Sequence, residues 1–270
     1  NNLLKMAYYS IFPEIDSTIY SHPDRTFMNT GKDEILELVK ERGTTNSRHY
    51  PSRILIKFKN DEIKSVISDT IGSAKFNDGT TKANLQLATV QPQTLTTILN
   101  IEAFAVSQSW QEGSGRYSNL PTGSDGVSWI NRNGSIFENK WIHTGEGIPW
   151  SAIYNGTNNT NGTSTGQTIG GFEIGNYTAD PLAAPAYFTP GTTGSISSSV
   201  ITPGGGMWYT GSGFESSQQF LYGDTLDVNM DLIDIVKKHS ASLFSSQIYP
   251  DGVTNYGFLL KQPDTVEANT

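Results

Sequence analysis

Short runs in which apolar and polar residues alternate are the feature that most limits what this chain can fold into. In residues 53–59, one side carries Ile54, Ile56 and Phe58, whereas the other side is made mostly of cations. Successive side chains of a β-strand point to opposite faces of a sheet, so this period of two predicts a strand with one buried face. The same reasoning predicts further strands at residues 17–20, 84–87, 100–106, 224–230 and 256–261.

Turn signals separate these runs, and the composition agrees with a fold made of strands and turns. Turn-forming residues cluster at positions 22–24, 77–79, 121–123 and 251–252. The 270 residues include 27 glycines and 12 prolines, while only 16% of residues are charged. We therefore predict an all-β protein with a jelly-roll-like antiparallel β-sandwich over about residues 10–262, in a single domain that covers residues 1–270.

Two segments favour helix when their sequences are considered alone. Residues 33–41 combine a helix-favouring composition with apolar residues at 35, 36, 38 and 39. Residues 231–239 place aspartates at the start and lysines at the end, as the helix dipole prefers, and we expect one short helix here. The aspartates at 224, 227, 231 and 234 are interpreted as capping and turn residues rather than calcium ligands, because the EF-hand pattern is absent.

The composition changes between about residues 150 and 215, where glycine, serine, threonine and asparagine dominate. We interpret this stretch as the main part of a long insertion into the sandwich at about residues 140–215, with short strands at residues 171–174 and 206–209. Disorder is the alternative, but Phe172, Tyr187, Phe188, Trp208 and Tyr209 provide apolar surface that an ordered insertion can bury.

The overall charge and the cysteine count exclude several classes of function. The net charge of −8 argues against nucleic-acid binding, which needs a basic surface. No apolar run approaches the roughly 20 residues that span a bilayer, so we expect no membrane partner. The absence of cysteine excludes disulfides and thiolate zinc sites, and it is compatible with assembly in a reducing cytoplasm.

The two ends of the sequence suggest a longer protein. Met6 opens a stretch that reads like a natural start, yet five residues precede it. The last residues, 262–270, contain no predicted strand or helix. We expect this chain to be the N-terminal part of a longer protein.

Catalytic motifs are weak in this sequence. Residues 162–166 match the GxSxG pattern, but polar low-complexity sequence surrounds them instead of the strand and helix that a nucleophile elbow requires. The carboxylate pairs Glu14 with Asp16 and Glu34 with Glu37 have the residue types of a glycosidase, as acids on strand edges often do. The four histidines (His22, His49, His143 and His239) lack metal-ligand spacing. We predict no catalytic residues, no metal site and no cofactor.

The stretch between the tryptophans at 110 and 129, here called the tryptophan loop (residues 109–129), is the main candidate for recognition. Trp110, Tyr117 and Trp129 have the aromatic faces that stack on sugar rings, so they form a possible sugar-binding platform. The alternative is that Trp110 and Trp129 cap the core of the sandwich, with their indole N–H groups bonded to loop carbonyls. We favour the core position and keep the platform as the minority interpretation.

An ordered set of segments resembles a β-sandwich module of the DNRLRE type, which is related to carbohydrate-binding modules. The resembling segments are residues 16–20, 29–31, 35–38, 53–58, 109–113, 126–129, 227–228 and 255–260. This resemblance implies a β-sandwich, and it also implies that residues 35–38 form a strand rather than a helix.

The whole sequence also resembles large virion structural proteins of T4-like myophages that infect marine cyanobacteria. Residues 12–16, 35–42, 110–121 and 208–215 carry this likeness. It implies a non-enzymatic protein of the virion, assembled in the host cytoplasm, which contacts other virion proteins and forms a homo-oligomer in the tail, neck or fibre apparatus. The rival expectation is a carbohydrate-binding adhesion module for host surface polysaccharide, and a polysaccharide-degrading enzyme ranks below both.

Overall fold

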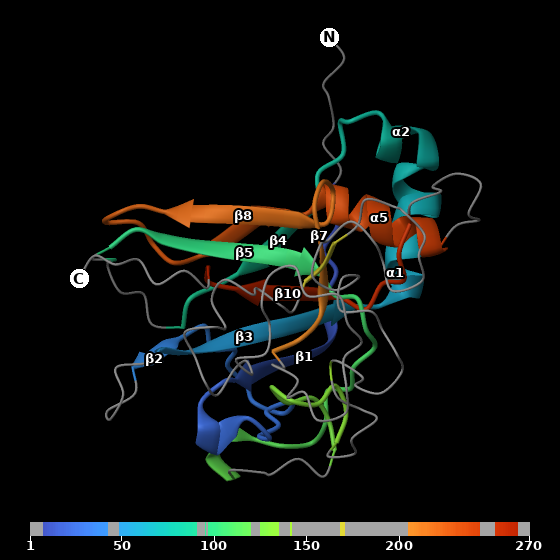
Figure 1. Ribbon diagram of the computed structural model, residues 1–270. Helices are drawn as coiled ribbons and strands as arrows, with labels where there is room; N and C mark the ends of the chain where they lie inside the picture. Colours follow the sequence, from blue (N-terminus) through green and yellow to red (C-terminus); the bar gives the residue numbers. More distant parts are fainter. Residues whose placement is uncertain are drawn as a thin grey trace, which may run out of the picture.

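The fold is described from a computed structural model of the chain (Figure 1). The structure describes residues 8–42, 49–90, 95, 97–119, 125–134, 141, 168–170, 205–243 and 252–263. These residues form antiparallel β-sheets with a few short helices, which confirms the predicted all-β class.

The main sheet is antiparallel throughout and has its strands in the order β1-β3-β10-β5-β8, with β2 paired to β3. Its strands are β1 (Pro13–Tyr20), β2 (Lys40–Arg42), β3 (His49–Phe58), β5 (Leu99–Ala105), β8 (Glu215–Phe220) and β10 (Phe258–Lys261). Two smaller antiparallel pairs join β4 (Asn84–Leu87) to β9 (Val228–Asp231), and β6 (Thr168–Gly170) to β7 (Trp208–Thr210). Most of the predicted strands are therefore present at nearly the predicted positions.

Strand β3 lies inside the main sheet and has both of its faces buried. Ile54 and Ile56 point to one side, where they are at most 4% exposed, and Leu55 points to the other side and is fully buried. Arg53 is also buried, although alternation predicted a solvent-facing row of cations. The prediction of one buried face is thus wrong, because both faces of the sheet are covered by other parts of the chain.

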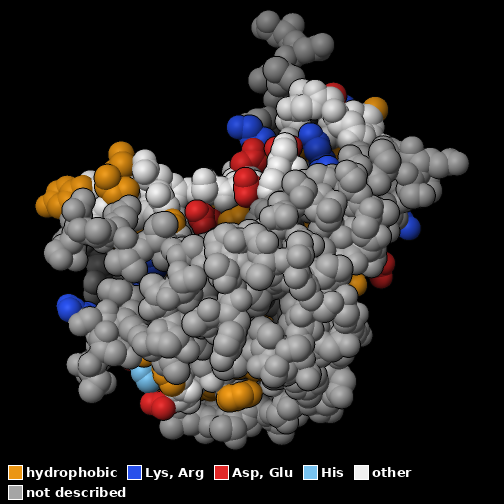
Figure 2. Space-filling view, in the orientation of Figure 1, with side chains coloured by type: hydrophobic (Ala, Val, Ile, Leu, Met, Phe, Trp, Pro, Cys, Tyr) orange, Lys and Arg blue, Asp and Glu red, His pale blue; other side chains and the backbone are white. Residues whose placement is uncertain are grey.

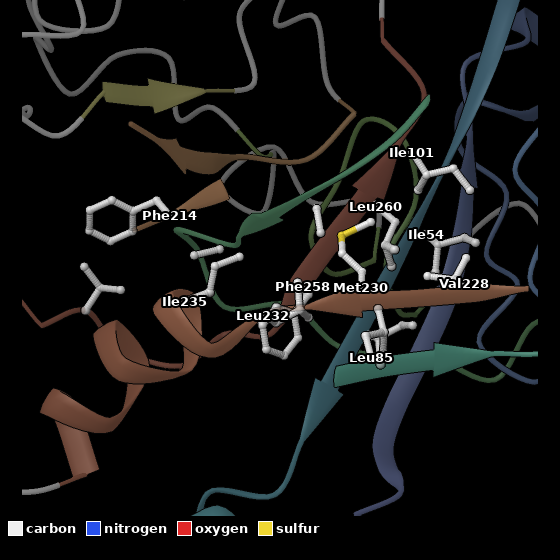
Figure 3. Close-up of a cluster of buried hydrophobic side chains, with 14 of the residues drawn as sticks. Ile54, Leu85, Ile101, Phe214, Val228, Met230, Leu232, Ile235, Phe258 and Leu260 are labelled. Carbon is white, nitrogen blue, oxygen red and sulfur yellow. The ribbon is translucent and has the colours of Figure 1, made fainter. Parts of the chain in front are cut away.

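One face of the main sheet carries an aliphatic core, which the β4–β9 pair covers (Figure 3). Leu85 of β4 and Val228 and Met230 of β9 alternate with exposed polar residues, so each of these strands buries one side only. The core also takes in Ile54, Ile101, Leu232, Ile235, Phe258 and Leu260. We use the name aliphatic core for this cluster.

The opposite face carries a cluster that we call the aromatic core. It is built from Trp110, Trp129, Trp141 and Trp208 with Ile19, Leu55, Phe104, Val106, Val127, Met207 and Leu259. The cover on this face comes from the tryptophan loop, from Trp141, and from Met207 and Trp208 at the start of β7. The two faces are therefore closed by different kinds of structure.

Three α-helices occur in the described residues: α1 (Asn60–Ser65), α2 (Ser73–Asn77) and α5 (Ile233–Leu243). A π-helical segment, η2 (Val66–Ile71), joins the first two, and the 3-10 turns are η1 (Pro23–Arg25) and η3 (Tyr117–Asn119). Helix α5 confirms the predicted helix at residues 231–239. The α1–α2 region was missed, although Ile63, Val66 and Ile67 recur at helical spacing and are buried.

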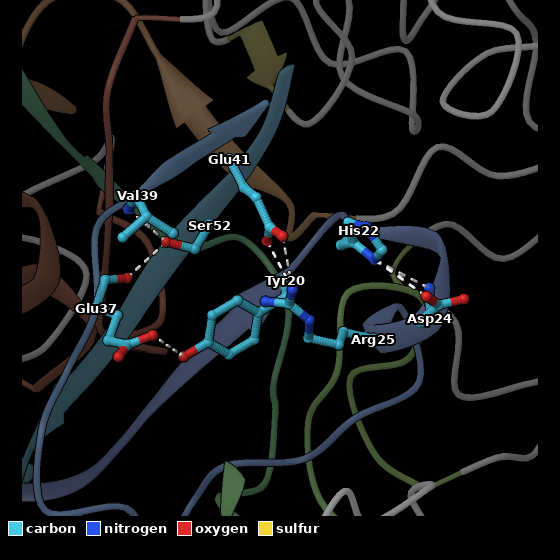
Figure 4. Close-up of polar contacts among 8 residues, drawn as sticks. All are labelled: Tyr20, His22, Asp24, Arg25, Glu37, Val39, Glu41 and Ser52. Atoms are coloured by element: carbon cyan, nitrogen blue, oxygen red, sulfur yellow. Dashed lines mark hydrogen bonds and ion pairs between the residues drawn. The ribbon is translucent and has the colours of Figure 1, made fainter. Parts of the chain in front are cut away.

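Residues 33–39 form neither the helix predicted from composition nor the strand implied by the resemblance at 35–38; only β2 is a strand here. Side-chain hydroxyls hold this segment instead of a backbone ladder (Figure 4). The Glu37 amide donates to Thr18 Oγ1 at 3.0 Å, and the Val39 amide donates to Ser52 Oγ at 2.8 Å. The Ser52 hydroxyl in turn donates to the Glu37 carbonyl at 2.6 Å. Hydroxyl residues on the neighbouring strands therefore satisfy the backbone without regular pairing.

Most of the predicted insertion at about 140–215, including the predicted strand at 171–174, lies outside the described residues. Its last part forms β7, and β8 follows directly at Glu215. Strand β8 was missed because its sequence, ESSQQF, is polar at five of six positions. Across the described residues, every helix is too short or too polar to span a bilayer.

Candidate functional site

The two tryptophans of the tryptophan loop lie inside the protein. Trp110 is 7% exposed, and its indole Nε1 donates a hydrogen bond to the Tyr256 carbonyl at 2.7 Å. Trp129 is 3% exposed, and its ring lies against the guanidinium of Arg53. Buried rings that already contact protein on their faces have no surface left for a sugar. The core position favoured from the sequence agrees with this burial.

Arg53 organises the aromatic core. Its guanidinium carbon lies 4.7 Å from the ring centroid of Trp129 and 4.9 Å from that of Trp208, and its Nη1 donates to the Gly205 carbonyl at 2.7 Å. Gly205 has a φ of 80°, and a Cβ there would lie 2.4 Å from Arg53 Nη1. The planar guanidinium lies between two aromatic rings. Arginine suits this position better than lysine, because a planar guanidinium can stack on aromatic faces and a compact ammonium cannot.

A second buried cation lies beside the Trp208 ring. Lys261 is 1% exposed, and its ammonium lies 5.6 Å from the Trp208 ring centroid and 5.7 Å from that of Phe104. Glu102, its direct partner across the β5–β10 pair, lies 3.5 Å away. The ion pair and the rings together compensate the cost of removing this charge from water.

Asn29 fixes the course of the tryptophan loop. Its side chain is fully buried and donates to the carbonyls of Glu112 and Val127 at 2.7 and 2.8 Å, while its Oδ1 accepts from the amides of Gly31 and Gly115. One amide side chain thus ties two ends of the loop to the segment after η1. Because Asn29 uses both its donor and its acceptor group, substitution would leave several buried backbone groups without partners.

Tyr117, the third predicted platform residue, lies on the outside of this loop and is 39% exposed. Its ring packs edge-on against Tyr20 with a centroid distance of 5.6 Å, and the Arg25 guanidinium lies 5.6 Å from its centroid. The Tyr117 amide donates to the carboxylate of Asp33, and Arg25 pairs with Glu41 at 2.7 Å (Figure 4 shows the Arg25–Glu41 pair). We call this group the Tyr117 cluster.

Two ionisable side chains of strand β1, Tyr20 and Asp16, have raised pKa values. Tyr20 donates to Glu37 Oε2 at 2.7 Å, and burial, with the help of this carboxylate, raises the pKa of Tyr20 above its ordinary value. Burial also raises the pKa of Asp16, and the nearby Glu112 carboxylate adds to this rise while the Lys32 ammonium opposes it. The raised pKa keeps the Tyr20 phenol protonated, and the raised pKa of Asp16 favours its protonated form.

The structure places the three residues of the possible platform in different surroundings. Trp110 and Trp129 belong to the aromatic core, and Tyr117 alone presents an exposed ring. The sequence pattern of three aromatics in one loop does not distinguish these positions. The residues that do, Asn29 and Arg53, were not singled out from the sequence as loop anchors, since a buried asparagine or arginine resembles an ordinary surface residue in a single sequence.

The other sequence candidates have structural partners where they are described. Glu14 pairs with Lys57 at 3.5 Å, and Glu34 pairs with Arg116 at 3.3 Å. Burial lowers the pKa of His239 to about 3, which keeps this side chain neutral. Within the described ranges, no three His, Asp or Glu side chains come together in a group suited to a metal ion. His143 and the GxSxG stretch at 162–166 lie outside those ranges.

A different surface stands out at the end of the main sheet where β8 finishes. Four exposed apolar side chains lie there, and we call them the tip patch: Val90, Ile98, Leu221 and Tyr222. Figure 2 shows apolar side chains gathered at this end, on the left of the view. Tyr222 is 76% exposed and Val90 is 66% exposed, so both side chains present most of their apolar surface to solvent.

Comparisons with known proteins add no relative. The chain matches no protein-family model, and searches among curated proteins and solved structures likewise find no significant similarity.

Proposed function

We propose that this chain is a non-enzymatic structural protein of a phage particle, which acts through protein–protein contacts in the tail, neck or fibre apparatus. The observation that carries the proposal is the tip patch, because exposed apolar side chains gathered at one end of a folded domain are typical of interaction surfaces. The sequence resemblance to virion structural proteins of T4-like cyanobacterial myophages is the reason for assigning the chain to a phage particle. The absence of cysteine and the acidic charge are compatible with assembly in a host cytoplasm.

We extend the proposal to the finer fold, a jelly-roll-like sandwich. The β4–β9 pair packs over one face of the main sheet through the aliphatic core, as the second layer of a sandwich would. The side chains of Ser216 and Gln218 also bond to the backbone of β9, so the edge of β8 turns toward the second layer. A closed edge of this kind limits uncontrolled strand pairing and leaves the tip patch for assembly.

Immunogold electron microscopy of intact particles tests the particle assignment. An antibody raised against residues 1–270 should label a fixed position on the particle, and antibody pre-absorbed with the purified chain should not. Antigen found only free in the lysate or on cell envelopes would overturn the assignment.

A second candidate function, binding of host surface polysaccharide, is favoured by the Tyr117 cluster. Tyr117 keeps a partly exposed ring whose orientation is fixed by Tyr20 and Arg25, and the Asp33 carboxylate lies next to it. A fixed ring beside hydrogen-bond acceptors is the arrangement that sugar stacking requires.

Binding of the chain to purified host polysaccharide tests this second function. Tyr117→Ala should weaken binding by about 1–3 kcal/mol, by analogy with stacking of bases on aromatic residues. Phe27→Ala is the matched control, because Phe27 is also an exposed aromatic residue, at 49% exposure, and does not belong to the Tyr117 cluster. Equal affinity of the wild-type chain and Tyr117→Ala would exclude this site.

A further inference from the structure

The segment before β1 forms a second exposed apolar element, which we call the aromatic arm (residues 8–12). Tyr8 is 79% exposed, Tyr9 is 54% exposed and Phe12 is 78% exposed. Ile11 turns the other way and packs on the cluster formed by Ile63, Ile67 and Phe76 of α1, η2 and α2. The arm is thus anchored at its base while its aromatic rings face solvent.

The arm does not bury these rings on its own chain. Its contact with β4 is a long hydrogen bond of 3.4 Å from the Tyr8 hydroxyl to Gln86 Oε1, and the rings remain exposed with that bond in place. Because these three aromatic side chains are exposed to water, burying them against another surface would be favourable. The arm therefore has the chemistry of a segment that docks on another surface.

The tip patch forms where the ends of four strands, β4, β5, β8 and β9, come together. The pairing of Leu99 with Phe220 places Ile98 and Leu221 side by side just past the last residues of the β5–β8 pair. The Gly223 amide donates to the Leu95 carbonyl at 3.3 Å, and the Thr89 amide donates to Asp227 Oδ1 at 2.9 Å. These bonds bring the segment after β4 and the turn after β8 to the same place, so the patch is a built surface rather than scattered side chains.

The arm and the tip patch lie at opposite ends of the main sheet. Four successive antiparallel pairings separate β1 from β8, so these two strands run in the same direction. The arm precedes β1, whereas Leu221 and Tyr222 follow β8. In Figure 1, β8 accordingly points toward the left end, away from helices α1 and α5 near which β1 begins.

Charge disfavours contact between two tips. Asp224 and Asp227 lie at the tip, where they accept from the amides of Leu221 and Thr89. Residues 87–99, the other part of the tip, are uncharged, and the arm itself, residues 8–12, carries no charged side chain. A tip-to-tip contact between two copies would bring like charges together, whereas an uncharged apolar arm on a tip meets no such repulsion.

We propose that the aromatic arm of one copy of this chain docks on the tip patch of the next copy, so that copies assemble head to tail. This proposal rests on the assembly function proposed above and names the partner as a second copy of the same chain. Because arm and tip are different surfaces at opposite ends, the contact is heterologous, and its repetition produces a closed ring or a filament.

Sedimentation velocity of the full 270-residue chain over a concentration series tests this contact. Two variants remove one surface each: an arm variant with Tyr8→Ser, Tyr9→Ser and Phe12→Ser, and a tip variant with Leu221→Ser and Tyr222→Ser. All five side chains are exposed, so folding should be retained, and circular dichroism checks this. Ile35→Ser is the matched control, because Ile35 is 50% exposed and belongs to neither surface.

The wild-type chain and the control should self-associate with increasing concentration. For each variant alone, the dissociation constant of self-association should rise by about tenfold or more. An equimolar mixture of the two variants should form a dimer and nothing larger, since only one intact arm and one intact tip remain between them. Self-association of the arm variant alone would overturn the proposal in favour of a tip-to-tip contact. A wild-type chain that stays monomeric would also overturn it, and the immunogold experiment would then still decide the particle assignment separately.

Discussion

The two faces of the main sheet are covered in different ways. The aliphatic core lies under a regular strand pair whose buried residues alternate with exposed ones, and no buried charge takes part in it. The aromatic core lies mostly under irregular segments, the tryptophan loop and Trp141, together with Trp208 of β7, and it needs Arg53 between two tryptophans and Asn29 as a polar anchor. Regular pairing satisfies its own backbone, whereas a covering loop depends on particular side chains. We therefore expect the loop-covered face to be the more sensitive to substitution.

The largest expected effect comes from removing the cation of the aromatic core. Arg53→Ala should lower the free energy of unfolding by about 3–5 kcal/mol, because it leaves a cavity between two rings and removes the donor to the Gly205 carbonyl. Chemical denaturation measures this change. Lys57→Ala on the same strand is the control, since its ion pair is partly exposed and should contribute less than about 1 kcal/mol. Similar losses for the two variants would contradict the role given to Arg53.

Removing the polar anchor should have the next largest effect. Asn29→Ala leaves the carbonyls of Glu112 and Val127 and the Gly115 amide without their partner, which should cost about 2–4 kcal/mol. Hydrogen exchange should show faster exchange at Gly115 while the amides of β3 stay protected. Uniformly faster exchange throughout the sheet would mean that Asn29 supports the whole fold rather than the loop.

A pH series tests burial beside the aliphatic core. The folded state holds the pKa of His239 at about 3, below its ordinary value of 6.5, because the side chain is buried. The unfolded chain therefore binds a proton that the folded chain does not as the pH falls below about 6.5, and stability should decrease by about 2 kcal/mol between pH 6.5 and 5. Denaturation of His239→Gln at several pH values should show a flatter dependence over this range. The same slope in both proteins would rule out His239 as its source.

The smallest effect is expected for a volume-conserving change in the aliphatic core. Met230→Leu keeps the buried volume under β9 and needs no polar partner, so it should cost less than about 1.5 kcal/mol. Chemical denaturation again provides the comparison with Arg53→Ala. A loss as large as that of Arg53→Ala would remove the distinction between the two faces.

This difference between the faces also explains what could be predicted from the sequence. Strands β3, β4, β5 and β9 and helix α5 were predicted because their buried positions follow the periods of two and 3.6 that local geometry imposes. Residues 33–39 were not, because the hydroxyls of Thr18 and Ser52, distant in sequence, satisfy their backbone. Strand β8 was missed because its polar side chains bond to β9 rather than filling a core.

The candidate sites divide in the same way. The sequence placed Trp110, Tyr117 and Trp129 in one loop, but only the packing of Arg53 and Asn29 decides which ring is exposed. The tip patch could not be predicted, because it forms from the ends of four strands that only the tertiary fold brings together. Exposed apolar residues such as Leu221 and Tyr222 look like ordinary core residues in a sequence.

Site-directed cross-linking tests the central claim, head-to-tail assembly, most directly, and the natural absence of cysteine makes it clean. A double variant, Tyr9→Cys with Tyr222→Cys, is oxidised mildly and separated on a non-reducing gel. The account predicts a ladder of dimers, trimers and larger species for the double variant, and little cross-linking for either single variant. A monomeric product with an internal disulfide, or strong dimer formation by Tyr222→Cys alone, would contradict it.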